Sequence, residues 1–385
     1  MAQQERIYLS PPHMGDKEQQ NVAEAFESNW ISSVGPQIEL FEKEMAAYLG
    51  IQKDQVLALN SGSSAIHLSM ILSHIGPGDC VLCSSFTFAA SIFPALYLGA
   101  KPVFVDSEAD TWNICPQSLE QSFSALAKEG KTVKALVAVS LYGQSYKHTQ
   151  VEEICQKWNV PIIEDSAEAL GASYKNQKCS TLGDFGILSF NGNKIITASG
   201  GGMLVAKDAQ HIAHAKALST QARVPNVPHY EHEEIGYNYR MSNILAGIGR
   251  GQLDILDDRV QRRRSIFEIY QSELNGYSGI SMMPEAEDSH SNRWLSVIRV
   301  PKTEKSHTRH LQVLEALSKE NIETRPTWKP MHLQPLFAEA PFYSSREKPF
   351  CEEVYSDGLC LPSGSSLDEL SQERVIAGIK KALQG

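Results

Sequence analysis

Residues 134–165 read KALVAVSLYGQSYKHTQVEEICQKWNVPIIED, and the architecture can be worked outward from them. The two ends, 134–140 and 160–165, are short apolar runs, whereas 148–158 between them has the spacing of an amphipathic helix. Parallel strands need a crossover of about a dozen residues, usually a helix, so the segment predicts a strand–helix–strand unit. Strands with continuous apolar runs are those covered on both faces, which predicts a parallel sheet between layers of helices.

The same alternation repeats on both sides of this unit. Seven candidate strands are QVLALN (55–60), CVLCSS (80–85), KPVFVD (101–106), KALVAVS (134–140), VPIIED (160–165), FGILSF (185–190) and GGMLVA (201–206). Further helical patterns lie at 63–75, 88–98 and 116–129. Only about ten residues separate the last two strands, too few for a crossover helix, which predicts an antiparallel pair there. The expectation is an α/β fold with a seven-stranded, mostly parallel sheet.

A different pattern follows the predicted sheet. One long helix is expected from Ser242 to Leu274, and its basic run Arg262–Arg264 is interpreted as a solvated helix face. After Gly276–Gly279 the sequence predicts a strand and two helices, at 294–300, 307–320 and 367–383. We therefore expect two domains, a large one over 1–275 with the connecting helix and a smaller C-terminal α/β domain over 276–385.

Composition and charge exclude several classes of protein. The 385 residues suit about two domains, and 35 Lys and Arg against 45 Asp and Glu give a net charge of −10. That sign disfavours nucleic acid as a partner. No apolar stretch approaches the roughly 20 residues that span a bilayer, and MAQQERIYLSPPHMG (1–15) lacks the features of an export signal. We expect a cytoplasmic protein without a membrane partner.

The cysteines predict neither a disulfide framework nor a metal centre. There are 7, an odd and scattered set in a long chain, which is typical of reduced thiols. Cys80 and Cys83 form one CxxC within an apolar run. Without a second pair or a histidine cluster they are expected to be buried strand thiols, and no metal site is predicted.

Polar residues that follow strands are the first candidates for chemistry, because ligands of open α/β sheets gather at the carboxyl ends of the strands. Asn60–Ser64 before a helix is either an anion cradle or a plain helix cap. Asp165 is an acid at the end of an apolar strand, an N-cap or a metal ligand if it stands alone. Taken alone, Lys194 would be a surface lysine and Gly200–Gly202 after it a turn. Taken alone, Phe86–Phe88 would supply rings that fill the core.

Together these four features fit one ligand better than four separate explanations. They would hold a flat ring that carries a phosphate, a ring nitrogen that needs an anion and an aldehyde that needs a lysine. Pyridoxal 5′-phosphate combines these features, and proteins bind it through a lysine Schiff base and an aspartate on the pyridinium nitrogen. The residues thus predict pyridoxal phosphate as cofactor, with Asp165 on the nitrogen and Lys194 on the aldehyde.

The chain also resembles a known family along almost its whole length. Five segments resemble successive motifs of the DegT/StrS sugar aminotransferases: NSGSSAIHL (60–68), SFTFAA (85–90), EDSAEALGA (164–172), GDFGILSFNGNKIITASGGGML (183–204) and GYNYRMSNILAGIG (236–249). Three more resemble the EpsN- and PglE-like branch, which aminates C4 of UDP-linked 4-keto-6-deoxy-N-acetylhexosamines for exopolysaccharide and glycan synthesis: IYLSPPHMG (7–15), NWISSVGPQIELFE (29–42) and ETRPTWKPMHLQPLF (323–337).

The resemblance implies a fold type I aminotransferase, a homodimer with shared active sites, and site residues by motif. Lys194 and Asp165 are its implied catalytic residues, and Asn238 would reach the phosphate of the neighbouring subunit. The implied cofactor-binding residues are Gly62, Ser63, Phe88, Asp165, Glu168, Ser189, Lys194 and Asn238. Lys194 also argues against the family's dehydratase offshoot, in which His replaces the lysine. Many members have Gln at Glu168, so the protonation and role of Glu168 stay open.

The implied reaction is a two-step transamination of a UDP-linked keto sugar with L-glutamate as amino donor. Arg325, Lys329 and His332, near Trp328, are candidate substrate residues, or else a solvent-facing basic loop. Arg240 is another candidate, with an intersubunit ion pair as its competing interpretation. The same chemistry on a C3-keto sugar or another nucleotide, and a non-catalytic sugar-nucleotide binder, stay open. The sequence does not fix the configuration of the new amine.

Overall fold

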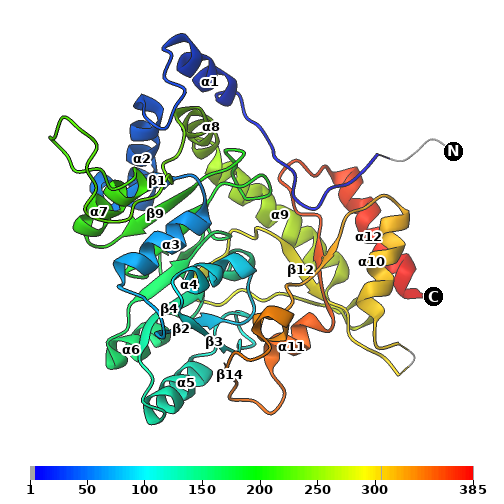
Figure 1. Ribbon diagram of the computed structural model, residues 1–385. Helices are drawn as coiled ribbons and strands as arrows, with labels where there is room; N and C mark the ends of the chain where they lie inside the picture. The colour runs from blue at the N-terminus through cyan, green and yellow to red at the C-terminus, as the bar shows by residue number, and fades with distance from the viewer. Residues whose placement is uncertain (1–4, 305, 385) are drawn as a thin grey trace.

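The computed structural model describes residues 5–304 and 306–384 as an α/β fold around a mostly parallel central sheet (Figure 1). The eight strands of this sheet lie in the order β1 (Val56–Leu59), β9 (Gly202–Ala206), β8 (Phe185–Ser189), β5 (Ile162–Asp165), β4 (Val133–Val139), β2 (Cys80–Ser84), β3 (Lys101–Val105) and β14 (Phe342–Tyr343). All seven predicted strands are present. The predicted antiparallel pair is also confirmed, because β8 and β9 run antiparallel, as do β9 and β1.

The eighth strand was not predicted. β14 comes from the C-terminal part of the chain and pairs in parallel with β3, placing Phe342 beside Phe104. Two residues are too few to show a strand period, so only the packing reveals this edge. The C-terminal part therefore completes the central sheet.

The sheet is buried on both faces, as its apolar strands predict. In β2, Val81 and Cys83 pack in one core cluster, whereas Cys80 and Leu82 pack in another on the opposite face. Because successive side chains of a strand point to opposite faces, Cys80 and Cys83 do not share a site. Both thiols are free and buried, which confirms their structural interpretation.

Helices cover these faces and extend one end of the molecule. The crossover helices are α3 (Gly62–Leu72), α4 (Phe93–Tyr97), α5 (Pro116–Lys128) and α6 (His148–Trp158), and α7 (Ala209–Ser219) follows β9. Toward the top of Figure 1, α1 (Glu18–Glu27) and α2 (Pro36–Leu49) pack on α8 (Asn243–Leu253). Short 3₁₀ turns lie at Lys53–Gln55, Ala89–Ser91, Leu141–Gly143, Tyr277–Gly279, Met331–Leu333 and Pro335–Phe337.

The single helix expected over 242–274 is wrong in two respects. It is two helices, α8 and α9 (Leu256–Leu274), because Ile255 leaves helical geometry at φ −110°, ψ 12°. The basic run on α9 is also not a solvated face. Arg263 is 1% exposed, and Arg264 forms an ion pair with Glu285.

A second, antiparallel sheet occupies the C-terminal part, with strand order β10 (Ser281–Met282), β12 (Ser296–Arg299), β15 (Gly358–Leu361) and β13 (Arg325–Pro326). It packs with α10 (Arg309–Lys319) and α12 (Glu369–Gln384), and the remaining elements are α11 (Phe350–Tyr355), β6 (Ser173–Tyr174), β7 (Gln177–Lys178) and β11 (Ser289–His290). We keep the division near residue 275 as a proposal. Two features cross this boundary. The C-terminal strand β14 belongs to the large sheet, and Ile7 near the N-terminus forms a bridge to Ile322.

A buried carboxyl secures the end of β5, and its removal gives a first prediction. Glu164 accepts hydrogen bonds from the Ser180 N–H (2.8 Å), the Leu182 N–H (2.9 Å) and the Ser166 hydroxyl (2.7 Å). Alanine at 164 would leave buried donors unpaired, so we expect the free energy of unfolding in urea to fall by at least about 3 kcal/mol. The exposed Glu153→Ala is the control, expected to change it by under about 0.5 kcal/mol. An equal loss in both variants would contradict this anchoring.

Candidate active site

A cavity of about 380 Å³ lies at the carboxyl ends of the central strands. Seven of the eight residues expected around a cofactor line it: Gly62, Ser63, Phe88, Asp165, Glu168, Ser189 and Lys194. They come from the ends of β5 and β8, the start of α3 and the connections that follow. The sheet thus brings together residues that lie more than a hundred positions apart in the chain.

One end of the cavity is an anion cradle at the start of α3. Ser61 caps this helix, and its side chain accepts the Ser64 N–H at 3.1 Å. The other N–H groups of the first turn have no partner within the helix, and the helix dipole adds positive potential there. A Cβ on Gly62 would stand 3.2 Å from that of Ser189, so glycine keeps the cradle open. The cradle fits a phosphate.

The glycines at 200–202, beside the cradle, do more than form a turn. Ser61 bridges to Gly201, which has a φ of +125° that favours glycine. A Cβ on Gly202 would overlap the backbone nitrogen of Gly62. These glycines therefore let β9 approach the start of α3 and shape the cradle.

Asp165 lies deeper in the cavity, at the end of β5, and is 6% exposed. Its carboxylate accepts the Ser91 hydroxyl at 2.6 Å and the Ala167 N–H at 3.1 Å. Ser91 in turn lies 2.8 Å from the hydroxyl of Thr87. Both hydrogen-bond partners are neutral, so they orient the carboxylate but do not neutralise its charge. That arrangement suits a protonated ring nitrogen.

Lys194 follows β8 in the turn that begins at Asn191. Its ammonium nitrogen lies 4.6 Å from the ring centre of Trp294, within cation–π range. It lines the cavity, which argues against the simple surface-lysine interpretation. An amine at this position can reach a group held between the cradle and Asp165.

Glu168 is buried in the cavity wall. Its Oε2 accepts the backbone N–H of Tyr142 at 2.7 Å. Burial raises the pKa of Glu168 to about 7, against the opposing effect of the nearby Lys194 charge. The carboxyl group therefore exchanges its proton near neutral pH, and its neutral form can donate a hydrogen bond as Gln would.

This raised pKa predicts a pH-dependent stability of the apoprotein. The pKa of Glu168 is about 7 against 4.5 for the free side chain, so its stabilising contribution is complete below pH 4.5 and is lost as pH rises through 7. Between about pH 5 and pH 8, wild type should lose up to about 3 kcal/mol of unfolding free energy relative to Glu168→Gln. Urea denaturation across this range measures the difference. The exposed Glu373→Gln should follow wild type, and parallel curves for wild type and Glu168→Gln would refute the prediction.

A larger cavity of about 580 Å³ adjoins the first and shares Asn193, Trp294 and Trp328 with it. Arg325 and Lys329 line this second cavity. Its wall is an aromatic stack, in which the ring of Tyr142 lies 6.4 Å from both Trp294 and Trp328. Trp328 also lies 5.2 Å from Phe88, the ring expected to stack on the cofactor. The two cavities therefore lie side by side and share these lining residues.

Sequence reasoning missed Trp294, Tyr142 and Ser91. Tyr142 follows the end of β4, so the rule that found Asp165 could have found it as well. Ser91 lies in a short turn after Phe88, and Trp294 precedes a strand of the other sheet. Nothing local in the sequence marks those two.

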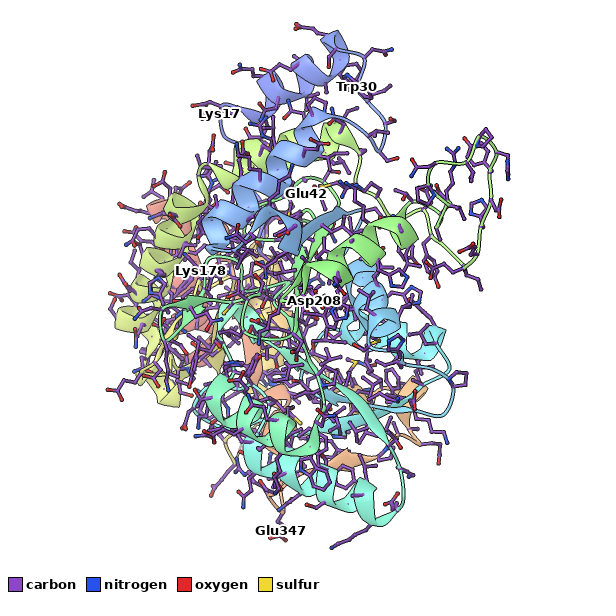
Figure 2. All side chains as sticks on the ribbon, turned by 90° about the vertical axis from the view of Figure 1, so that its left-hand side faces the viewer. Lys17, Trp30, Glu42, Lys178, Asp208 and Glu347 are labelled. Carbon is purple, nitrogen blue, oxygen red and sulfur yellow. The ribbon has the colours of Figure 1, made fainter. Side chains whose placement is uncertain are left out.

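Three expected site residues lie outside both cavities. Arg240 is buried and pairs with Glu42 at 2.5 Å within the same chain, so the suggested intersubunit pair is not needed to balance its charge (Figure 2 labels Glu42 on α2). His332 lies 2.6 Å from the Ser85 hydroxyl and 3.2 Å from Glu352, and burial is the main cause that lowers its pKa.

Asn238 is exposed, and its backbone oxygen accepts the side-chain amide of Asn60 at 3.2 Å. It lies in the connection between α7 and α8, where it bridges to Thr220, and part of this connection projects from the body in both views (Figures 1 and 2). Within one chain, Asn238 therefore does not reach the cavity.

Two other classes of site are absent from the described residues. Over 5–304 and 306–384, no group of three or more His, Cys, Asp or Glu side chains is placed to hold a metal ion. In the same ranges, no helix has the length and apolar character needed to cross a membrane.

Comparisons with known proteins identify relatives along the whole chain. EpsN of Bacillus subtilis (strain 168), by name a pyridoxal phosphate-dependent aminotransferase, is 48% identical over 372 residues, 96% of this chain and 94% of EpsN. GDP-perosamine synthase of Caulobacter vibrioides (strain ATCC 19089 / CIP 103742 / CB 15) is 35% identical over 379 residues and 98% of each chain. The crystal structure of the aminotransferase TlmJ from Streptoalloteichus hindustanus superposes with a TM-score of 0.89 over 99% of both chains, at 28% identity.

A family model matches residues 12–380, nearly the whole chain. The cradle, the buried carboxylate and the lysine in one cavity fit the cofactor of that family, pyridoxal phosphate. The chain belongs to the DegT/DnrJ/EryC1/StrS aminotransferase family and is a pyridoxal phosphate-dependent sugar aminotransferase.

Proposed function

We propose that this enzyme transfers an amino group from L-glutamate to C4 of a UDP-linked 4-keto-6-deoxy-N-acetylhexosamine, as a cytoplasmic homodimer in exopolysaccharide or glycan synthesis. The observation that carries the proposal is the pair of adjoining cavities. One holds the cradle, Asp165 and Lys194, and the other is larger and carries two cationic side chains. EpsN, the relative at 48% identity, supports the placement in that branch of the family.

The residues of the smaller cavity divide the chemistry among them. Pyridoxal phosphate, when bound, supplies an aldehyde for amine exchange and an electron-accepting ring. Gly62, Ser63 and Ser189 would hold its phosphate, Asp165 would pair with its ring nitrogen, and Phe88 would pack against the ring. Lys194 would bind the aldehyde and, as a free amine, would take the proton from the donor α-carbon and later deliver a proton to C4 of the sugar.

The larger cavity binds the rest of the sugar nucleotide. Lys329 supplies positive charge for a diphosphate, and Arg325 adds to it by exchanging its ion pair with Glu323, at 2.9 Å in the same cavity, for the phosphates. Trp328 offers an aromatic wall to the hexose. His332, which contacts Ser85, and Arg240, which pairs with Glu42, lie outside both cavities and make no substrate contact within one chain. Asn238, exposed in one chain, reaches the cofactor phosphate of the neighbouring subunit in the homodimer.

A second candidate differs in the nucleotide. GDP-perosamine synthase covers this chain almost fully at 35% identity, which makes a GDP-linked sugar the next candidate after a UDP-linked one. The catalytic residues do not distinguish a UDP-linked from a GDP-linked substrate, because the reacting carbon of the sugar lies far from the nucleobase.

The deciding experiment is a substrate panel. Purified holoenzyme is incubated with L-glutamate and 4-keto-6-deoxy sugars linked to UDP, GDP or dTDP, and with a 3-keto isomer, while 2-oxoglutarate release is followed. We expect the UDP-linked N-acetyl sugar to give the highest kcat/KM, and NMR of its product to give the configuration at C4. Fastest turnover of a GDP-linked sugar would establish the second candidate, and turnover of simple keto acids alone would refute both.

A further inference from the structure

Arg263 is a buried cation that neither cavity uses. It is 1% exposed on α9, and no ion pair involves it among residues 5–304 and 306–384. Of its neighbours in the basic run, Arg264 pairs with Glu285, and Arg262 is only partly buried and donates to the carbonyl of Leu367. Burial lowers the pKa of Arg263 to about 9, the mark of a charge removed from water. A buried charge without an ion-pair partner is costly to folding, which suggests that Arg263 has a role other than packing.

The partners of Arg263 converge on a single backbone atom. The guanidinium donates from Nη2 to the Ser10 hydroxyl at 3.0 Å and from Nη1 to the carbonyl of Trp294. The Ser10 hydroxyl then donates to the carbonyl oxygen of Asn193 at 2.8 Å. The indole Nε1–H of Trp294 donates to the same oxygen, also at 2.8 Å. One arginine thus fixes both donors that hold this carbonyl.

Asn193 immediately precedes Lys194, so its carbonyl belongs to the peptide group that joins the two residues. Trp294 also makes a second contact, because its ring faces the Lys194 ammonium at 4.6 Å. The same indole therefore holds the backbone next to the lysine and presents its face to the lysine amine.

We infer that Arg263, Ser10 and Trp294 form a clamp that positions Lys194 for reaction with pyridoxal phosphate. Arg263 is a positioning residue, since it lines neither cavity and acts through the other two. The inference uses only the family's cofactor chemistry. It goes beyond the proposed sugar specificity and does not depend on which nucleotide sugar is the substrate.

The clamp makes two expectations for Arg263→Met. Methionine is close to arginine in volume, but it leaves the buried carbonyl of Trp294 without its donor, so the urea midpoint of the apoprotein should fall modestly. A displacement of about 1 Å at a reacting group can cost about 10²-fold in rate. We therefore expect the folded variant to capture the cofactor at Lys194 much more slowly than this modest loss of stability would explain.

The experiment measures that capture directly. Apoprotein is mixed with pyridoxal phosphate, and the covalent form is followed by absorbance and by borohydride trapping with mass mapping of the Lys194 peptide. We expect Arg263→Met to slow capture by about 10- to 100-fold, and to lower kcat while KM for the sugar nucleotide changes less than about threefold. Arg262→Met, the neighbouring arginine on the same helix, should match wild type in both.

Variants of Ser10 and Trp294 test the clamp independently, in case Arg263→Met folds poorly. Ser10→Ala removes one hydroxyl, and Trp294→Phe keeps a ring under the amine but loses the N–H donor. Each should slow capture, and Ser10→Ala combined with Arg263→Met should be no slower than Arg263→Met alone, because both act on one carbonyl. Capture at the wild-type rate in Arg263→Met, an equal slowing in Arg262→Met, or a slowing no larger than the loss of stability explains would overturn the clamp.

Discussion

Replacing Lys194 with alanine is expected to abolish covalent cofactor binding and to lower kcat by at least about 10⁴-fold. The loss is large because one amine serves twice, as the group that binds the cofactor and as the group that moves the proton. The cradle at α3 and Asp165 remain, so the variant should still hold pyridoxal phosphate without a covalent bond. Borohydride reduction followed by peptide mass mapping should find a pyridoxyl group on Lys194 in wild type and on no peptide of the variant.

A matched lysine separates this effect from a general loss of charge. Lys207, exposed just after β9, lies outside both cavities, and Lys207→Ala should keep the adduct on Lys194 and wild-type turnover. An adduct on a different lysine, or Lys194→Ala turnover within tenfold of wild type, would show that the reactive amine has been misassigned.

The second large effect is expected at Asp165. Asparagine has the same shape and can keep the contact with the Ser91 hydroxyl, but it carries no charge to hold a ring nitrogen protonated. Removing one preorganised electrostatic partner of a reaction costs about 10²- to 10³-fold in kcat, and we expect a loss of that size for Asp165→Asn. The absorbance of the bound cofactor should change as well, because its ring nitrogen loses a proton.

Asp106 provides the control for this change. It is a fully buried carboxylate just after β3, and it accepts the N–H groups of Phe350 (2.9 Å) and Cys351 (3.0 Å) at the start of α11. Asp106→Asn should reduce stability while leaving the cofactor absorbance of the folded protein unchanged. The role assigned to Asp165 fails if Asp165→Asn keeps both the wild-type spectrum and the wild-type kcat.

The sequence predicts the cofactor cavity well because of one property of parallel sheets. The carboxyl ends of parallel strands meet at one edge, so Asp165 comes to lie opposite Ile187, two residues before Ser189, once their strands are recognised. Antiparallel β9 then brings Gly201 to Ser61. Each strand is a long enough apolar run to be identified alone. The geometry of the central site follows from local patterns and strand direction.

The rest of the site depends on packing between distant segments. Trp294 and Ser10 meet Asn193 from two other parts of the fold, and no local pattern records that meeting. Arg263 is a different case. Val260, Arg263, Phe267 and Tyr270 repeat at intervals of three and four residues and are all buried, so the helical period places Arg263 on the apolar stripe of α9. The run of arginines by itself suggests a solvated helix face, whereas the helical periodicity indicates that Arg263 is buried.

The order in which the ribosome releases the chain has a consequence for the cofactor. Lys194 and Asp165 emerge early, whereas Trp294, Trp328 and the edge strand β14 all lie at least 100 residues after the lysine. During synthesis the nascent chain therefore exposes its reactive amine before the walls of the pocket exist. We expect stable vitamin B6 loading to be a late event of translation, completed only after Tyr343 has left the exit tunnel.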